Sequence, residues 1–275
     1  MTLLDAKDQA MHFRDILYSV HDGIARITLN KPEKLNALSW GSWAEIENAL
    51  VMAEADDAVK VVVFTGAGRG FCAGTDLTTT TREEDWPERP FTGRAGMMRS
   101  RYLATAQVYH CRKPTIAAVN GPCVGAGFSL AMACDIRIAA ESARFSAIFV
   151  KRAIVADTGA TWLLPRLVGT EWAYRLLYTG ELIDAQKARE IGLVSEVVPD
   201  GELPNAVNAL AGSIARGPSV AIELMKRLVQ EGQTRGLDEQ IELEQFLQQI
   251  THQTEDAEEG RRSFLERREP VFKGR

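Results

Sequence analysis

Residues 115–135 are the stretch that most restricts how this chain folds. An apolar segment, TIAAV, leads into NGPCVGAGFSLAMACD, which carries Gly121, Gly125 and Gly127. Glycine permits tight turns and lets another backbone approach closely. The start of a helix also presents free N–H groups and a partial positive charge, which suit an oxygen that becomes negative during a reaction. A close helix–strand crossing favours the same small residues, so this stretch by itself leaves packing and anion binding open as alternatives.

Strands and helices alternate through the first two thirds of the chain. Residues 16–20 and 24–29 flank a turn that contains glycine, which predicts a β-hairpin. Residues 60–65 and 136–140 are apolar enough to form buried strands on either side of residues 115–119. This alternation predicts an α/β layer with parallel strands.

Polar and helical segments complete the predicted organisation. The polar segment 78–96 predicts a mobile loop or lid, and residues 97–111 predict a helix before Lys113 and Pro114. Beyond Gly169 the pattern becomes helical, with one strand-like segment at 194–198. The helices are expected at residues 171–178, 184–191, 203–216, 219–230, 238–249 and 256–268.

Composition excludes several classes of protein. The 275 residues carry a net charge of −5, which argues against a general binder of nucleic acid or of anionic membranes. No apolar run reaches the roughly 18 residues that a membrane span requires, and the first residues resemble no targeting signal, so a cytoplasmic protein is expected. The four cysteines form no CxxC pair, which predicts reduced thiols in the core.

Four separated motifs occur in the order expected for one known family. They are NKPEKLNAL at 30–38, GFCAGTDL at 70–77, AVNGPCVGAGFSLAMACD at 118–135 and YTGELIDAQKAREIGLVSEVV at 178–198. Together they resemble the crotonase superfamily, also called the enoyl-CoA hydratase/isomerase family, over residues 14–275. The likeness is strongest to the branch that uses an aspartate as acid/base, as in isomerases of epoxyphenylacetyl-CoA type.

The resemblance implies a fold, an assembly and a substrate class. The fold is a crotonase-like α/β spiral of β-β-α units, with a core at residues 14–200 and a helical oligomerisation region at 201–275. Members form homotrimers or dimers of trimers. They act on an acyl-CoA thioester, whose coenzyme A belongs to the substrate, so the resemblance implies no separate cofactor and no metal.

The resemblance also assigns residues to the site. Two backbone N–H groups, those of Ala73 and Ala126, are expected to polarise the thioester carbonyl. Such donors suit an enolate oxygen, and losing one typically costs about 10²–10³ in rate. Lys273 is expected to reach the coenzyme A of a neighbouring subunit. The other expected contacts with coenzyme A and substrate are Lys34, Leu35, Ala37, Thr75, Asp76, Leu77, Val124, Gly125 and Phe149.

The positions that carry the two catalytic glutamates of hydratases hold other residues. They correspond to Ser129 and Phe149. A phenylalanine cannot transfer a proton, and a serine needs an activating partner to act as a base. Ordinary two-glutamate hydration is therefore not expected.

One carboxylate remains in the right region. Asp157 lies in FVKRAIVADTGATWLLPRLV, residues 149–168, which resembles the isomerase branch where this aspartate is the acid/base. Apolar neighbours such as Ile154, Val155 and Trp162 suit proton transfer. An alternative is that Asp157 only caps a helix that begins near Thr158, a position that aspartate favours.

Two other functions compete with isomerisation. In a hydrolytic enzyme of dehalogenase or thioesterase type, Asp157 would act as a nucleophile while a histidine activates water. The helix before Lys113 has no histidine at the position where the dehalogenase pattern places one. A catalytically reduced protein that only binds acyl-CoA is the second alternative. RNA binding is disfavoured because the chain is acidic and has no arginine-rich stripe.

Overall fold

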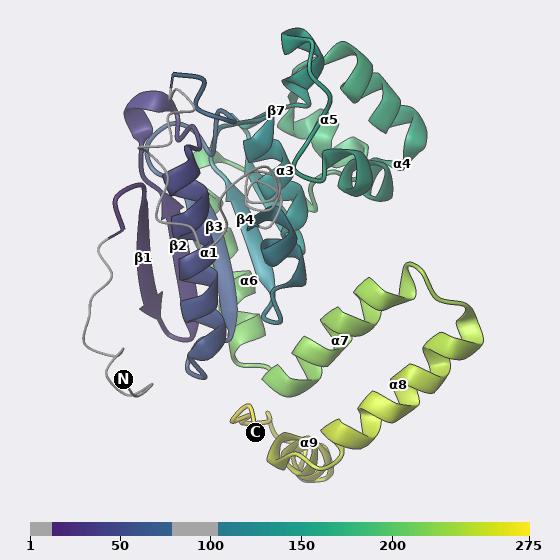
Figure 1. The fold of residues 1–275 in the computed structure, drawn as a ribbon. Coiled ribbons are helices and arrows are strands. Elements are labelled where there is room, and N and C mark those ends of the chain that lie inside the picture. The colour runs from purple at the N-terminus through teal and green to yellow at the C-terminus, as the bar shows by residue number, and fades with distance from the viewer. Residues whose placement is uncertain (1–12, 79–103) are drawn as a thin grey trace, which may run out of the picture.

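A six-stranded sheet forms the centre of the molecule (Figure 1). The computed structural model describes residues 13–78 and 104–275. Every neighbouring pair after the first is parallel. In spatial order the strands are β1 (Ile16–His21), β2 (Ile24–Leu29), β3 (Val61–Gly66), β4 (Thr115–Val119), β6 (Ile136–Ala140) and β9 (Glu196–Val198).

The predicted hairpin is confirmed. β1 and β2 are antiparallel, and His21 pairs with Ile24. Asp22 and Gly23 between them have φ angles of 51° and 77°. A two-residue turn with both residues in the left-handed region matches the natural twist of the two strands, which explains the glycine.

Both faces of the central sheet are covered at β3 and β4, so these two strands are buried at nearly every position. Residues such as Val62 and Phe64 face a large core that includes residues of α1 (Trp40–Ala55). Val61 and Val63 face a second core with α6 (Leu203–Ala215). α6 completes this second core, so the first helix of the region predicted at 201–275 packs directly against the sheet.

A second, three-stranded sheet was not predicted from the sequence. It has the order β5 (Pro122–Val124), β7 (Arg144–Ser146) and β8 (Ile183–Asp184). β5 lies inside the glycine-rich stretch and leads directly to α3 (Ala126–Ala133). The stretch therefore contains a short strand as well as a turn.

The remaining helices lie around and beyond the sheets. The predicted helix at 171–178 is the second half of α4 (Ala160–Thr179), which is broken at Gly169, where φ is 75°. α7 (Ser219–Gly232) and α8 (Leu237–Thr251) project from the core as an arm (Figure 1). The others are η1 (Pro32–Lys34), η3 (Ile148–Arg152), α5 (Ala185–Glu190), η4 (Asp200–Glu202) and α9 (Glu255–Glu266).

Other predictions meet the structure only in part. The predicted lid at 78–96 lies outside the described residues except for Thr78, and the helix predicted at 97–111 is helical over residues 104–110.

All four cysteines are free and buried, as predicted. Burial raises the pKa of Cys72 to about 12 and that of Cys111 to about 11. Within the described ranges, no helix combines the length and apolar character that a membrane span requires.

Candidate active site

The loops that follow β2 and β3 are held together by two asparagines. Asn36, in the first loop, donates its side-chain amide to the carbonyls of Ala67 (2.9 Å) and Gly70 (2.8 Å) in the second loop. Asn120, directly after β4, donates to the carbonyls of Gly66 (2.9 Å) and Gly68 (3.0 Å). Three segments far apart in sequence are thereby fixed at one end of the central sheet.

The second loop continues between β5 on one side and the first loop on the other. The carbonyl of Cys72 accepts the N–H of Val124 in β5 at 3.0 Å. On the opposite side, Leu38 donates its N–H to the carbonyl of Gly74 (2.7 Å) and accepts the N–H of Asp76 (2.9 Å). Thr75 is thus paired with Leu38 in a parallel bridge. In such a bridge the N–H of the central residue points away from the partner strand.

This geometry corrects one of the two predicted oxyanion donors. The N–H of Ala73 donates to the carbonyl of Leu35 at 2.8 Å, so it is already satisfied by the first loop. The N–H of Thr75 points away from that loop and donates to no other described residue. The amide on this loop that has no acceptor among the described residues is therefore that of Thr75, two residues beyond the predicted donor. The sequence signal for it is Gly74, whose φ of 98° redirects the chain.

The second predicted donor, Ala126, lies beside the same loop. It is the first residue of α3, where backbone N–H groups have no partner within the helix, and it donates to no other described residue. A Cβ atom on Gly74 would lie 3.1 Å from the carbonyl oxygen of Val124 and 3.6 Å from the nitrogen of Ala126. The second loop therefore passes directly over the start of α3.

Of the two interpretations of the glycine-rich stretch, the structure confirms close packing and leaves anion binding as a prediction. A Cβ atom on Gly127 would lie 2.4 Å from the Cβ of Cys72, so α3 packs against the second loop with no space for a side chain. The same close approach brings the start of α3, with its free amide, next to Gly74. Close packing is thus what places the Ala126 amide beside the second loop.

Asp157 lines a small hollow of about 30 Å³ next to Thr75. Its side chain is half-buried. The interpretation of Asp157 as a helix cap is wrong, because the N-cap of α4 is Gly159 and no side chain makes a capping hydrogen bond there. The lining residues are Leu38, Ser39, Trp40, Trp43, Thr75, Asp76, Asp157 and Thr158.

Thr158 was missed as a candidate site residue, although its backbone conformation and its buried hydroxyl are both energetically unfavourable. Its φ is 51°, in the left-handed region that a β-branched residue rarely adopts. Its side chain is buried and its hydroxyl has no hydrogen-bond partner. Strained and unsatisfied residues gather at functional sites. No pattern in the sequence signals such a conformation.

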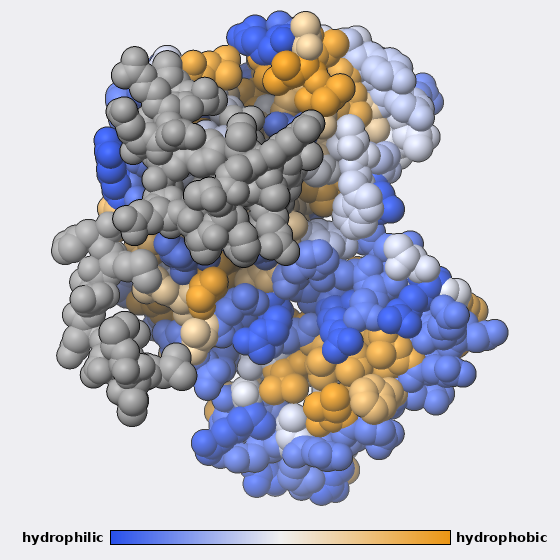
Figure 2. Space-filling view, viewed as in Figure 1, coloured by the Kyte–Doolittle hydropathy of each residue, from blue (hydrophilic) through white to orange (hydrophobic). Residues whose placement is uncertain are grey.

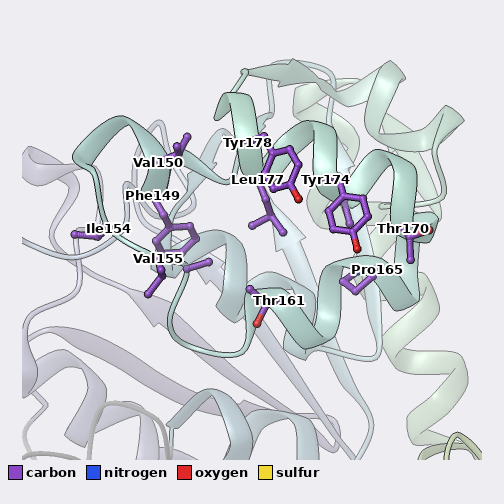
Figure 3. A pocket seen from close by; sticks show the side chains of 12 residues that line it. Phe149, Val150, Ile154, Val155, Thr161, Pro165, Thr170, Tyr174, Leu177 and Tyr178 are labelled. Atoms are coloured by element: carbon purple, nitrogen blue, oxygen red, sulfur yellow. The ribbon is translucent and has the colours of Figure 1, made fainter.

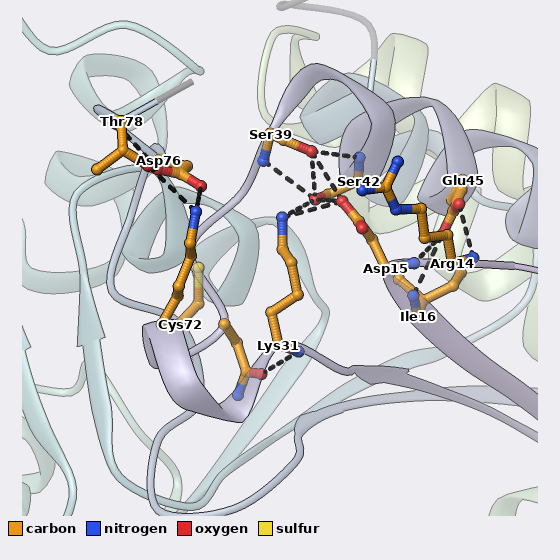
Figure 4. Close-up of polar contacts among 12 residues, drawn as sticks. Arg14, Asp15, Ile16, Lys31, Ser39, Ser42, Glu45, Cys72, Asp76 and Thr78 are labelled. Carbon is orange, nitrogen blue, oxygen red and sulfur yellow. Dashed lines mark hydrogen bonds and ion pairs between the residues drawn. The ribbon is translucent and has the colours of Figure 1, made fainter. Parts of the chain in front are cut away.

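Asp76 and Lys34 meet as a partly buried ion pair at the edge of the hollow. Lys34 Nζ lies 2.8 Å from Asp76 Oδ2, and the other carboxylate oxygen accepts the N–H (2.9 Å) and hydroxyl (2.6 Å) of Thr78. Figure 4 shows Asp76 and Thr78 apart from a second cluster that surrounds Asp15. Burial raises the pKa of Asp76, but the hydrogen bonds from Lys34 and Thr78 outweigh it and hold this pKa well below its usual range.

The two residues at the positions of the hydratase glutamates, Ser129 and Phe149, are not placed to act as an acid or a base. Ser129 is fully buried in α3, and its hydroxyl donates to the carbonyl of Gly125 at 3.4 Å. Phe149, in η3, lines a separate apolar groove of about 450 Å³ that η3 and α4 enclose (Figure 3). No carboxylate takes their place on these two elements.

The remaining predicted residues divide into two groups. Leu35, Ala37, Leu77, Val124 and Gly125 lie on the loops and strand that meet around Thr75, and Leu77 is 74% exposed. Within its own chain, Lys273 is not brought to this site. Its Nζ pairs with Glu255 of α9 at 3.1 Å, and the adjacent Gly274 lies against Lys60, at the opposite end of β3.

No metal site is apparent in the part of the chain that the structure describes. There, no three His, Cys, Asp or Glu side chains are grouped so that they could hold an ion. What the site offers is two backbone donors on adjacent segments, one half-buried carboxylate and one neutralised carboxylate.

Comparison with known proteins points to one family. Residues 19–275 match the family model described as enoyl-CoA hydratase/isomerase. The chain is 37% identical to 1,2-epoxyphenylacetyl-CoA isomerase of Escherichia coli, over 94% of this chain and 98% of that protein. It is 35% identical to crotonyl-CoA hydratase of Syntrophomonas wolfei, over 95% of this chain and 99% of that protein.

Solved structures confirm the predicted fold class. The enoyl-CoA hydratase/isomerase of Mycobacterium paratuberculosis superposes with a TM-score of 0.88 at 33% identity, over 96% of this chain and all of that chain. The α/β spiral with a helical C-terminal region is therefore the fold of this chain as well.

Proposed function

Because the chain belongs to the enoyl-CoA hydratase/isomerase family, we propose that it is an acyl-CoA isomerase in which Asp157 transfers the proton. One observation carries the proposal: Asp157 shares a hollow with Thr75 and is not used as a helix cap. An acid/base must lie within reach of the reacting carbon, and the oxyanion donor marks where the thioester binds.

The proposed reaction needs one carboxylate and two amides. Asp157 removes a proton from the α-carbon of a β,γ-unsaturated acyl-CoA, and the electron pair moves onto the thioester oxygen to form a dienolate. The N–H groups of Thr75 and Ala126 stabilise that negative oxygen. The protonated Asp157 then returns the proton to the γ-carbon, the thioester carbonyl re-forms, and the double bond becomes conjugated.

Isomerisation is preferred to hydration because neither position that carries a catalytic glutamate in hydratases holds an acid/base here. Adding water across a double bond requires that both protons of a water molecule be handled. Ser129 is buried and bonded to the backbone, and Phe149 has no titratable group. Relatives of this chain include both an isomerase and a hydratase. The preference for isomerisation therefore rests on the residues of the site.

The proposal predicts that Asp157→Asn abolishes isomerisation. Asparagine has nearly the same shape but accepts no proton at neutral pH, so the conversion of a 3-enoyl-CoA to its 2-enoyl isomer should fall by at least about 10²-fold. Absorbance of the conjugated product measures the rate. Binding of a non-reactive acyl-CoA, measured by calorimetry, should stay within about threefold of wild type.

Three outcomes would contradict this function. Full activity of Asp157→Asn would exclude Asp157 as the acid/base. Vigorous hydration of crotonyl-CoA by the wild type would show that a second acid/base operates. An acyl adduct on Asp157, seen by mass spectrometry during turnover, would replace isomerisation by the hydrolytic alternative.

A further inference from the structure

The hollow that contains Asp157 is lined by a second acidic residue, Asp76. Only 4% of the Asp76 side chain is exposed, so water does little to weaken its charge. Asp76 also follows Thr75 directly in sequence. A buried negative charge therefore lies one residue from the amide that would bind a developing oxyanion.

Such a charge opposes the proposed reaction at two points. It repels the dienolate oxygen that forms at the Thr75 amide, and it disfavours the ionised form of Asp157 that starts the reaction. Like charges in one site are among the strongest perturbations of carboxylate ionisation. An active site with this layout works only if the Asp76 charge is neutralised.

Lys34 supplies the neutralising charge. Its Nζ lies 2.8 Å from Asp76 Oδ2 and 3.1 Å from the hydroxyl of Thr78. The lysine reaches across from η1 in the first loop, whereas Asp76 lies on the second loop. Thr78 adds two hydrogen bonds to the other carboxylate oxygen.

We propose that Lys34 is an electrostatic positioning residue, which neutralises Asp76 so that negative charge can develop at the Thr75 amide and on Asp157. This role rests on the proposed function and differs from contact with a phosphate of coenzyme A. Lys34 acts through Asp76 and does not touch the reacting atoms.

Other charged groups near the hollow are already paired. Behind Ser39, the carboxylate of Asp15 accepts hydrogen bonds from Lys31 (2.9 Å), Ser39 (2.7 Å) and Ser42 (2.5 Å) (Figure 4). Among the described residues that line the hollow, Asp76 and Asp157 are the titratable groups. Loss of Lys34 therefore removes a positive charge that is paired with an acidic residue lining the same hollow as Asp157.

Removing the lysine should change both the rate and its pH dependence. Lys34→Met should lower kcat/KM for a 3-enoyl-CoA by about 10- to 30-fold, the effect of removing one positive charge at moderate effective dielectric. The acidic limb of the kcat/KM profile should move to higher pH by about one unit. Lys34→Gln should show the same loss of rate and the same shift of the pH profile. It serves as the test variant if Lys34→Met does not fold.

Rescue by a second substitution separates charge from structure. In Lys34→Met/Asp76→Asn both charges are gone, so the pH profile should return to the wild-type position and most of the rate should return. Asp76→Asn alone should move the acidic limb to lower pH. If Lys34 and Asp76 were only a mechanical tie between the loops, each single variant would lose the same activity and the double variant would recover none. That pattern overturns the proposal.

Two controls distinguish neutralisation of Asp76 from a general effect of lysine removal and from phosphate binding. Lys31→Met breaks a matched lysine–aspartate pair whose two residues do not line the hollow, and it should leave the pH profile in place. With a pantetheine thioester, which lacks the nucleotide phosphates, the effect of Lys34→Met should persist. Disappearance of the effect would assign Lys34 to phosphate binding. Failure of the proposed function is recognised separately, because Asp157→Asn would then remain active.

Discussion

At the scale of single residues, small side chains decide whether the site can form. Gly127 has no space for a Cβ atom because Cys72 of the second loop lies against it. A larger residue would push the start of α3 away from the loop that carries Thr75. The sequence shows the glycine but not its neighbour, which lies more than fifty positions earlier.

Gly127→Ala should therefore destabilise the protein. The added methyl group would lie 2.4 Å from the Cβ and 2.7 Å from the carbonyl oxygen of Cys72, so backbone has to move. We expect a loss of about 2–4 kcal/mol in the free energy of unfolding, measured with urea. Gly201→Ala is the matched control, because a Cβ there meets nothing within 4 Å, and it should change stability by less than about 0.5 kcal/mol. Equal losses in the two variants would mean that the contact between Gly127 and Cys72 is not as tight as the structure has it.

The two predicted oxyanion donors, Ala73 and Ala126, show which properties of a backbone amide can be predicted from sequence. Ala126 lies where it was predicted, at the first turn of α3. Ala73 was wrong, because a backbone amide is identified by where it points, and that depends on the φ of Gly74 and on pairing with Leu35 and Leu38. Sequence places the loop, whereas hydrogen bonding to a distant segment selects the amide.

At the scale of elements, long periodic segments were predicted well and short strands were not. Residues 115–119 and 136–140 form β4 and β6 with the predicted bounds. β5 and β7 have three residues each and β8 has two, too few for an alternating pattern to appear. These strands exist because segments far apart in sequence pair with one another.

The attachment of α7 to the core gives a prediction at this scale. Lys226 Nζ lies 2.8 Å from Asp135 Oδ2 and 3.0 Å from the carbonyl oxygen of Lys113, and its side chain is largely buried. Lys226→Met should lower stability by about 1–3 kcal/mol and speed hydrogen exchange over residues 219–232.

Arg227 on the same helix is the matched control. Its guanidinium pairs with Glu231 at an exposed position, where ion pairs contribute little. Arg227→Met should leave both stability and exchange near wild type. If Lys226→Met were equally silent, the arm would be held by other contacts.

At the scale of the whole molecule, apolar surface remains uncovered. Val155 is 86% and Tyr178 is 70% exposed beside the groove of η3 and α4. Figure 2 shows a further apolar strip along the α7–α8 arm, where Met225, Val229 and Phe246 are exposed. Apolar patches of this kind are typical of surfaces that meet other chains.

We propose, on this basis, that the protein assembles as a trimer or a dimer of trimers. Light scattering after size exclusion should give a mass three or six times that of the 30.3 kDa chain. The mass should hold on dilution to micromolar concentration. A monomer under these conditions would leave these apolar side chains in contact with water and would count against assembly.

The sequence by itself determined the family, the α/β class and the loops that bear the site, because apolar periodicity and local motifs are properties of neighbouring residues. It also located Asp157 and showed which residues replace the two glutamates. Only the tertiary structure decided that the amide of Thr75 rather than Ala73 is available, that Asp157 does not cap α4, and that Lys34 pairs with Asp76. Each of these depends on where a group points relative to a distant segment, and that direction is set by packing and hydrogen bonding across the fold.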